Sequence, residues 1–167
     1  NKIYLDLCIE TFKKYNDEDF EIIQVDDISI SRYIPDAPKN INELNDDIKI
    51  NYLKFNLLYN YGGLWIDVNT IVLTNLKIFT DKLIQYDFIG FGCIEPNCEN
   101  NSYYSKPILS ILGSRKNSIL IKNIKDAINK LLQEKNYKED IQQIFWNNLS
   151  KLISDNKYEY YHFNPIY

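Results

Sequence analysis

The sequence has no methionine, a single histidine, and only two arginines and two alanines among its 167 residues. The lone histidine, His162, argues against Ser-His-Asp and Cys-His catalysis and against histidine-rich metal sites, because each of these needs a histidine placed beside specific partners. Without a methionine the chain has no start residue. We therefore expect it to be part of a longer protein.

Cysteine is scarce, and long apolar runs and concentrated positive charge are missing. Cys8, Cys93 and Cys98 are too few and too widely spaced for a disulfide framework or a four-cysteine zinc site. Cys93 and Cys98 could pair in an oxidising compartment, but reduced thiols are the simpler expectation. No apolar run approaches 18 residues, so we expect no membrane span in this stretch. The net charge of −4 and the scattered lysines argue against a nucleic-acid partner.

Four residue types dominate what is present: Ile (26), Asn (21), Lys (17) and Tyr (14) supply almost half of the chain. This bias is typical of an A+T-rich genome. Hydrophobic residues at 45% and charged residues at 25% are ordinary for a globular protein. Neither a repeat nor a Gly/Ser linker divides the chain, so we expect one domain over residues 1–167.

The spacing of apolar residues predicts helices that alternate with short strands. We expect long helices over residues 3–15, 45–60, 118–133 and 139–153. We expect strands over residues 20–25, 64–66, 88–92, 108–112 and 158–163. This alternation indicates an α/β domain, in which ligands bind where strands end.

The stretch from Asn51 to Asn69 carries the residues best suited to chemistry. It reads as a helix, a glycine turn at Gly62-Gly63, a short buried strand and then Asp67. In an extended chain Asp67 and Asn69 share one face, where their oxygens suit Mg²⁺ or Mn²⁺ together with phosphate oxygens. Asn51 and Lys54 share a helix face. On that face the cation suits a phosphate and the amide suits a hydroxyl.

Tyr59-Asn-Tyr-Gly-Gly-Leu-Trp-Ile-Asp-Val-Asn69 resembles the Tyr-Gly-Gly-aromatic-Ile-Asp-x-Asp signature of sugar-nucleotide glycosyltransferases with a GT-A fold. The families most similar in style are the capsular polysaccharide synthesis proteins and the glycosyltransferases containing a DXD sugar-binding region. The resemblance is sharpest over residues 54–73 and extends weakly to residues 5–25. It implies a GT-A-like (Rossmann-like) mixed, mostly parallel sheet flanked by helices. The domain would be incomplete at its N-terminus, because nothing before Ile3 resembles the first strand of the family.

The resemblance also implies a function: metal-assisted transfer of a hexose from a nucleoside diphosphate sugar to a glycan or protein-linked acceptor. The first motif Asp falls on Asp67, the expected catalytic and donor-binding residue, and Asn69 takes the metal-binding position of the second. The resemblance implies Mn²⁺ or Mg²⁺ as the cofactor, with Asp67 and Asn69 as its ligands. The expected donor-binding residues are Asn51, Lys54, Gly63, Trp65 and Asp67.

Three positions depart from the family pattern: Asn51 stands for Asp, Lys54 for Arg and Asn69 for Asp. Drift toward A+T-rich codons could account for all three. The alternative function is a catalytically weak or inactive glycosyltransferase-like module that binds a sugar nucleotide or a glycan. A further alternative is an unrelated α/β domain for metal-dependent phosphate transfer.

Three other features have a structural and a functional interpretation. Asp26-Asp27 could contact a ribose, but a loop and helix cap is the simpler interpretation. Ser114 could line an acceptor site. Trp146 could stack on a sugar, although its place on an amphipathic helix favours the core.

Overall fold

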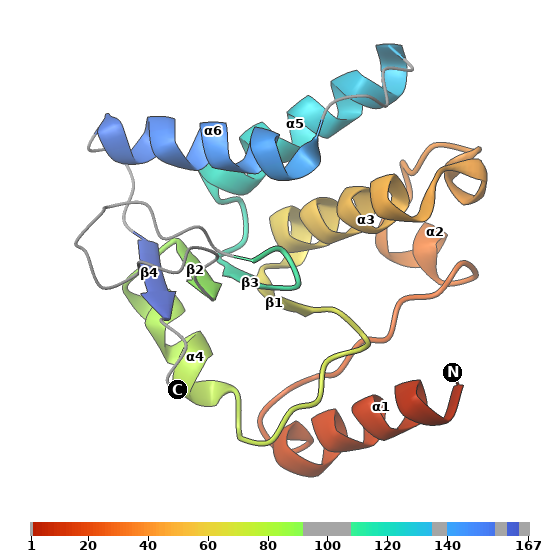
Figure 1. Ribbon diagram of the computed structural model, residues 1–167, viewed down its shortest axis with the longest axis vertical. Coiled ribbons are helices and arrows are strands. Elements are labelled where there is room, and N and C mark those ends of the chain that lie inside the picture. The colour runs from red at the N-terminus through yellow and green to blue at the C-terminus, as the bar shows by residue number, and fades with distance from the viewer. Residues whose placement is uncertain (1, 92–107, 135–139, 156–159, 164–167) are drawn as a thin grey trace.

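The structure is a computed structural model, and it describes residues 2–91, 108–134, 140–155 and 160–163 (Figure 1). Cys93, Cys98 and the remainder of the chain lie outside these residues. The elements are α1 (Lys2–Asn16), α2 (Ile30–Tyr33), η1 (Ile41–Glu43), α3 (Asp46–Tyr61), β1 (Gly63–Ile66), α4 (Lys77–Thr80), η2 (Asp81–Ile84), β2 (Phe88–Phe91), β3 (Ile111–Ser114), α5 (Ile119–Glu134), α6 (Ile141–Ser154) and β4 (Tyr160–Phe163).

The four strands form one mixed sheet in the order β1-β3-β2-β4. β3 pairs antiparallel with both β1 and β2, whereas β2 and β4 are parallel. It follows that β1, β2 and β4 run in one direction and β3 alone is reversed. The carboxyl ends of these three strands therefore lie at the same edge of the sheet, where β1 continues into Asp67.

The mixed α/β architecture is confirmed, but the expectation of a mostly parallel sheet is wrong for the pairing of neighbouring strands. Two of the three pairs are antiparallel, because β3 lies between two strands that run the other way. The strand expected over residues 20–25 is also wrong, since these residues form neither helix nor strand. Ile22 and Ile23 are 37% and 45% exposed there. The strand expected over residues 108–112 instead begins at Ile111 and continues to Ser114.

A cluster of apolar side chains fills the space between the sheet and helices α3, α5 and α6 (Figure 1). Phe55 of α3, Phe88 of β2 and Phe145 of α6 are completely buried. The ring of Phe145 lies 6.2 Å from that of Phe55 and 5.7 Å from that of Phe88, measured between centroids. Aromatic pairs at these distances add to the stabilisation from burial. The cluster thereby fixes α3 against the sheet.

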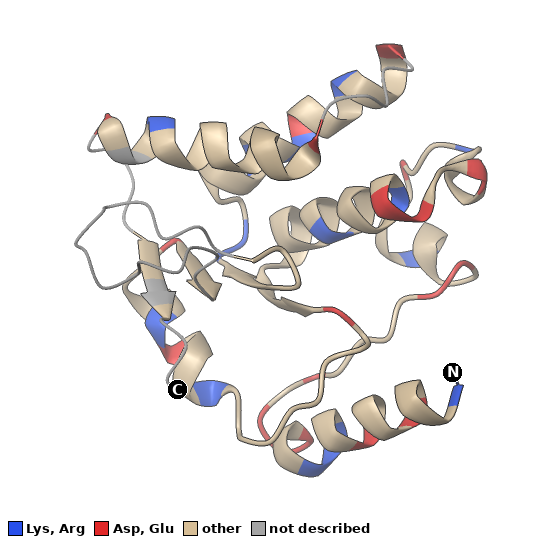
Figure 2. Cartoon of the chain, viewed as in Figure 1, with Lys and Arg blue, Asp and Glu red and all other residues tan. Residues whose placement is uncertain are grey.

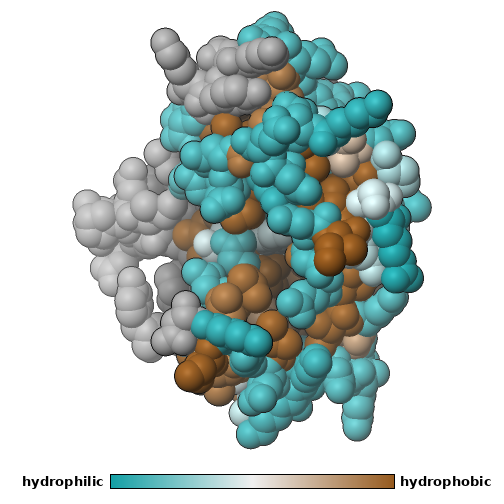
Figure 3. Space-filling view, turned by 90° about the vertical axis from the view of Figure 1, so that its right-hand side faces the viewer, coloured by the Kyte–Doolittle hydropathy of each residue, from teal (hydrophilic) through white to brown (hydrophobic). Residues whose placement is uncertain are grey.

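Helix α1 lies below the sheet in Figure 1 and is held by hydrogen bonds to the chain that follows β1. Of its expected apolar face only Cys8 is fully buried, whereas Ile3 is 81% exposed. Figure 3 shows further hydrophobic side chains at the surface on the side that faces right in Figure 1. Within the described residues, each helix is too short or too polar to cross a membrane.

Two glycines make the turn between α3 and β1, and both have positive φ angles, +74° at Gly62 and +90° at Gly63. A β-carbon on Gly62 would lie 2.7 Å from the backbone nitrogen of Lys116, whereas one on Gly63 would meet no atom within 4 Å. Gly62 therefore has two reasons to be glycine, and Gly63 has only its backbone angle.

We predict that Gly62→Ala lowers the free energy of unfolding more than Gly63→Ala does. Both variants carry the cost of a positive φ angle at a residue other than glycine, about 1–3 kcal/mol. Only Gly62→Ala adds a clash with a backbone that cannot move without disturbing the start of α5. Urea unfolding of the two variants and the wild type measures the difference. Equal losses would contradict this account of the turn.

Candidate functional site

Helix α3 carries two of the expected site residues and is fixed at both ends. At its start, the side chain of Asn45 accepts a hydrogen bond from the backbone nitrogen of Asp47 at 2.8 Å, which caps the helix. At its end, the backbone nitrogen of Gly62 donates to the carbonyl of Leu58 at 2.9 Å. The following strand then runs back beneath the helix, so residues of α3 and β1 meet.

The side chain of Lys54 is buried at the point where α3 crosses β1, with a residue exposure of 2%. Its Nζ lies 3.5 Å from Oδ1 of Asn51 and 3.8 Å from Oδ1 of Asp67. The same nitrogen lies 5.6 Å from the centre of the Trp65 ring, a cation–π distance. Among the described residues, both polar contacts of the ammonium are at the long end of the range for a hydrogen bond or an ion pair.

Asp67 follows β1 directly, and its carboxylate is held by one of its two oxygens. Oδ1 accepts a hydrogen bond from Nε1 of Trp65 at 2.6 Å and faces Lys54. Among the described residues, Oδ2 has no hydrogen-bonding partner. The backbone nitrogen of Asp67 donates to Ser110 at 2.9 Å, which extends the β1–β3 pairing by one residue. Asp67 therefore presents one oriented oxygen, with 29% of its side chain exposed.

Burial lowers the pKa of Lys54 below its ordinary value, because removal from water disfavours the charged form. The negative charge of Asp67 opposes this effect and raises the pKa of the same ammonium. A negative charge beside this buried amine favours its charged form, as the carboxylate of Asp67 does here.

The structure brings together Asn51, Lys54, Trp65 and Asp67, which we call the lysine–carboxylate site. Asn51 is oriented from both ends of its amide, with Nδ2 donating to the carbonyl of Asp47 at 2.8 Å and Oδ1 facing Lys54. Gly63 lies at the other end of β1, exposed and paired with Ser114. Its expected contact with a donor stays a prediction.

The extended geometry expected for Asp67 and Asn69 is wrong. The backbone nitrogen of Thr70 donates to the carbonyl of Asp67 at 3.0 Å, so residues 67–70 form a turn. Asn69 is exposed within this turn. Its carbonyl accepts a hydrogen bond from the hydroxyl of Tyr4 at 2.8 Å. Its metal-binding role stays a prediction, now with turn geometry in place of a strand.

Sequence reasoning missed the residues of α1 that hold this turn and the chain after it. Besides Tyr4, Thr11 accepts a hydrogen bond from the backbone nitrogen of Val72 at 3.0 Å, and Asn16 accepts one from Leu76 at 2.8 Å. Tyr4 and Thr11 are seven residues apart and flank the buried Cys8, so they share one helix face. The spacing of these residues indicates that this face of the helix contacts the protein, but it does not indicate which segment the helix contacts.

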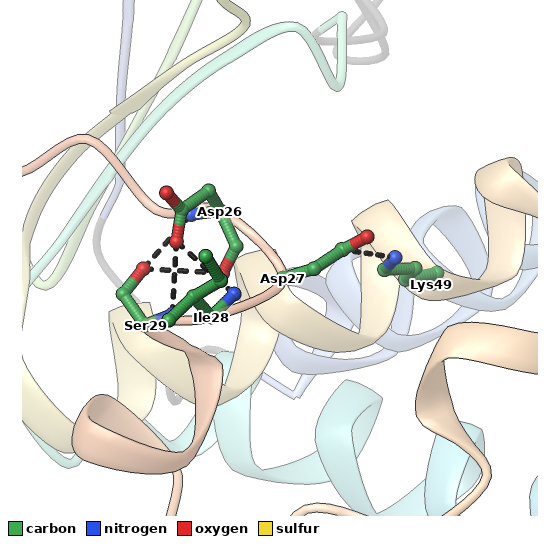
Figure 4. A network of polar contacts seen from close by, with 5 residues as sticks. All are labelled: Asp26, Asp27, Ile28, Ser29 and Lys49. Carbon is green, nitrogen blue, oxygen red and sulfur yellow. Dashed lines mark hydrogen bonds and ion pairs between the residues drawn. The ribbon is translucent and has the colours of Figure 1, made fainter.

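The three features with two interpretations have the contacts that their structural interpretation predicts. Asp26 accepts hydrogen bonds from the backbone nitrogens of Ile28 and Ser29, and Asp27 forms an ion pair with Lys49 of α3 (Figure 4). Ser114 is fully buried and its hydroxyl donates to backbone carbonyls, including that of Asp87 at 3.3 Å. Trp146 lies in the core, 9% exposed.

The charges of the described residues are interspersed over the helices and loops (Figure 2). Within the described part of the chain, no three His, Cys, Asp or Glu side chains gather as a ready metal site. A metal at Asp67 would take one carboxylate oxygen from the protein, the amide oxygen of Asn69, and phosphate or water oxygens. Mg²⁺ accepts such sets, which often include only one or two carboxylates.

Fold and site together define an α/β domain with a buried lysine facing a carboxylate at the end of an edge strand. The family model for capsular polysaccharide synthesis proteins matches residues 4–165. The chain belongs to this family, which assigns it to glycan biosynthesis. Comparisons with the curated proteins and with the solved structures find no match.

We predict that Lys54→Met raises the free energy of unfolding at pH 7, because it removes a charge that burial disfavours. The folded-state pKa of Lys54 lies below the unfolded value of about 10.4. Between these two values the unfolded chain binds more protons, so the stability of the wild type rises with pH. The advantage of the variant should therefore shrink toward pH 10. Urea unfolding of both proteins at several pH values measures it.

Lys122→Met is the matched control, since Lys122 is exposed on α5 and its hydrogen bond to Asp126 raises its pKa. Its effect should be small and of opposite sign, a slight loss of stability at pH 7 that fades as Lys122 deprotonates. A Lys54→Met protein that is less stable than the wild type at pH 7 would contradict the assignment of Lys54 as a costly buried charge.

Proposed function

We propose that the chain is a glycosyltransferase that transfers a hexose from a nucleoside diphosphate sugar to a glycan or protein-linked acceptor. The observation that carries the proposal is the meeting of Lys54, Trp65 and Asp67 at the end of β1. Membership of the capsular polysaccharide synthesis family supports it, as does the Tyr-Gly-Gly-Leu-Trp-Ile-Asp segment that forms the site.

Lys54 is suited to the diphosphate of the donor. Its ammonium has weak contacts with Asn51 and Asp67, at 3.5 and 3.8 Å, and a phosphate oxygen would supply the strong charged hydrogen bond that these do not. The positive charge would then stabilise the negative charge that develops on the leaving diphosphate. Asn51 would turn its amide toward a ribose or sugar hydroxyl.

Asp67 is suited to orient the sugar and to bind a divalent cation through Oδ2. Trp65 fixes the carboxylate through Oδ1, so the second oxygen keeps a defined direction without ligand. Mn²⁺ or Mg²⁺, when bound, would supply Lewis-acid stabilisation of the leaving diphosphate. Asn69 would add one neutral oxygen from the turn. A site with one carboxylate should bind the metal weakly until the donor phosphates contribute oxygens of their own.

The alternative function is a module that binds a sugar nucleotide or glycan without turnover. Two features favour it. Asn69 is neutral, and the ammonium of Lys54 lies close to the carboxylate of Asp67, where it would repel a metal ion. Calorimetry distinguishes the two. Nucleotide-sugar binding that ignores added Mn²⁺, together with the absence of transfer and hydrolysis, would support the module.

We predict that a UDP-, GDP- or ADP-hexose with Mn²⁺ raises the melting temperature of the wild type and that Asp67→Asn abolishes the shift. At 100 times its dissociation constant a ligand adds about 2.7 kcal/mol of stability. For a domain of this size that corresponds to roughly 5–10 °C. Turnover of the same donor, followed as release of the nucleoside diphosphate, should fall with Asp67→Asn to background.

Asp126→Asn is the control, because Asp126 is an exposed carboxylate on α5 that pairs only with Lys122 among the described residues. This variant should keep both the thermal shift and the turnover. The proposed function fails if no nucleotide sugar in the panel shifts the wild type or is consumed by it.

We further predict that Asn69→Asp lowers the Mn²⁺ concentration needed for half of the donor-dependent thermal shift. A second carboxylate raises the charge of the ligand set, which strengthens binding of hard cations. Titration of Mn²⁺ at a fixed donor concentration measures the change. An unchanged midpoint would remove Asn69 from the metal site and leave Asp67 as the one acidic ligand proposed.

A further inference from the structure

A cavity of about 510 Å³ lies beside α3 and α5, away from the lysine–carboxylate site. Tyr52, Asn56 and Asn60 of α3 line it, together with Lys125, Asn129 and Gln133 of α5. We call these six residues the amide pocket. Residues of the 34–44 segment close the cavity. A cavity of this volume lies within the usual range of small-molecule sites.

The two helices each present one stripe to this cavity. In each helix the three residues of the amide pocket are spaced four apart, so each set lies on one helix face. At 100° per residue, Lys54 lies about 160° around α3 from both Tyr52 and Asn56. The amide pocket and the lysine–carboxylate site are therefore nearly opposite each other on the same helix.

Most of the amide groups of the pocket have no hydrogen-bonding partner among the described residues. Asn56 donates through Nδ2 to the carbonyl of Tyr52 at 2.8 Å, which uses one of its two amide hydrogens. Among the described residues, the side chains of Asn60, Asn129 and Gln133 form no hydrogen bond. Amides elsewhere do pair, for example Gln143 with Asn147 at 2.7 Å on α6.

The abundance of asparagine in the chain does not account for this grouping. Asn supplies four of the thirteen residues that line the cavity but only 21 of the 167 in the chain. The enrichment is more than twofold, and it occurs on two separate helices and on the 34–44 segment. A feature of the cavity, rather than of the composition, sets it.

The chemistry of the lining selects a neutral, hydroxyl-rich ligand. A carboxamide offers both a donor and an acceptor, which matches a hydroxyl group that is also both. The cavity contains one acid, Asp36, and one base, Lys125, so its formal charges cancel. Burial and the nearby charge of Asp36 raise the pKa of Tyr52, which keeps its hydroxyl protonated. Pro35 and Leu132 add apolar surface suited to the C–H face of a sugar ring.

We propose that the amide pocket is a second carbohydrate site, which binds a neutral mono- or disaccharide unit of a glycan. The proposal depends on the cavity and its amides alone. It stands whether or not the lysine–carboxylate site transfers a sugar.

The test is a titration of the full ¹⁵N-labelled chain with maltose, cellobiose, lactose and N,N′-diacetylchitobiose, followed by NMR in the absence of any nucleotide sugar. We expect the side-chain NH₂ signals of Asn56, Asn60 and Asn129 to shift at millimolar concentrations of at least one sugar. The backbone signals of Lys54 and Asp67 should stay in place. Glucose 1-phosphate and glucuronic acid should bind more weakly than the neutral sugars.

The double variant Asn60→Leu/Asn129→Leu should weaken the binding about tenfold, since it removes two hydrogen-bonding amides and keeps side chains of similar size. Asn147→Leu, an exposed change on α6, is the matched control and should bind as the wild type does. The proposal is overturned if no neutral sugar shifts these signals, if the charged sugars bind more tightly, or if the double variant keeps its affinity. Because no donor is present, failure of the proposed transferase activity cannot produce any of these results.

Discussion

The buried ammonium group of Lys54 is the feature on which the arrangement of the lysine–carboxylate site depends. Removing a charge from water is costly, and here the cost is offset by an amide oxygen, a carboxylate and the face of an indole ring. All three partners must be in place together. Asn51 lies on the same helix as Lys54. Trp65 and Asp67 reach Lys54 only because two glycines turn the chain sharply from α3 into β1. The backbone of that turn packs against the start of α5, so the pair is coupled to the core.

The same arrangement orients the side chains of the site but leaves some of their hydrogen-bonding groups without a described partner. Trp65 and Lys54 hold one oxygen of Asp67, and the other is directed by the strand end without a described partner. Among the described residues, Lys54 likewise has one hydrogen bond and one ion pair for its three donors. A site that satisfied itself fully would have no binding energy to offer a ligand. The turn that follows Asp67 is in turn anchored by Tyr4, so α1 contributes to the geometry without reaching the site itself.

Local patterns in the sequence predicted the long helices and the meeting of Asn51, Lys54, Trp65 and Asp67, because each depends on spacing within 20 residues. What failed depends on distant partners. An apolar run such as residues 20–25 forms a strand only beside another strand, and the described residues provide none. The place of β3 between β1 and β2 is equally non-local. The turn at Asn69 was missed because the residues that hold it belong to α1, more than 60 positions away. The motif alone was enough to identify the family, because its residues are adjacent in the sequence.

The opposite faces of α3 bear different chemistries, and the helix between them limits how they could cooperate. An α-helix with its side chains is about 10–12 Å across. If both proposals hold, a sugar held in the amide pocket is therefore not the one that reacts near Asp67. It would have to be a unit farther along the same glycan, with the chain passing around the helix. Anchoring at such a distance raises the effective concentration of the acceptor end at the reacting site without any new contact there. Two weak sites on one rigid helix would then suit a polymer better than one strong site, because each added unit must also be released.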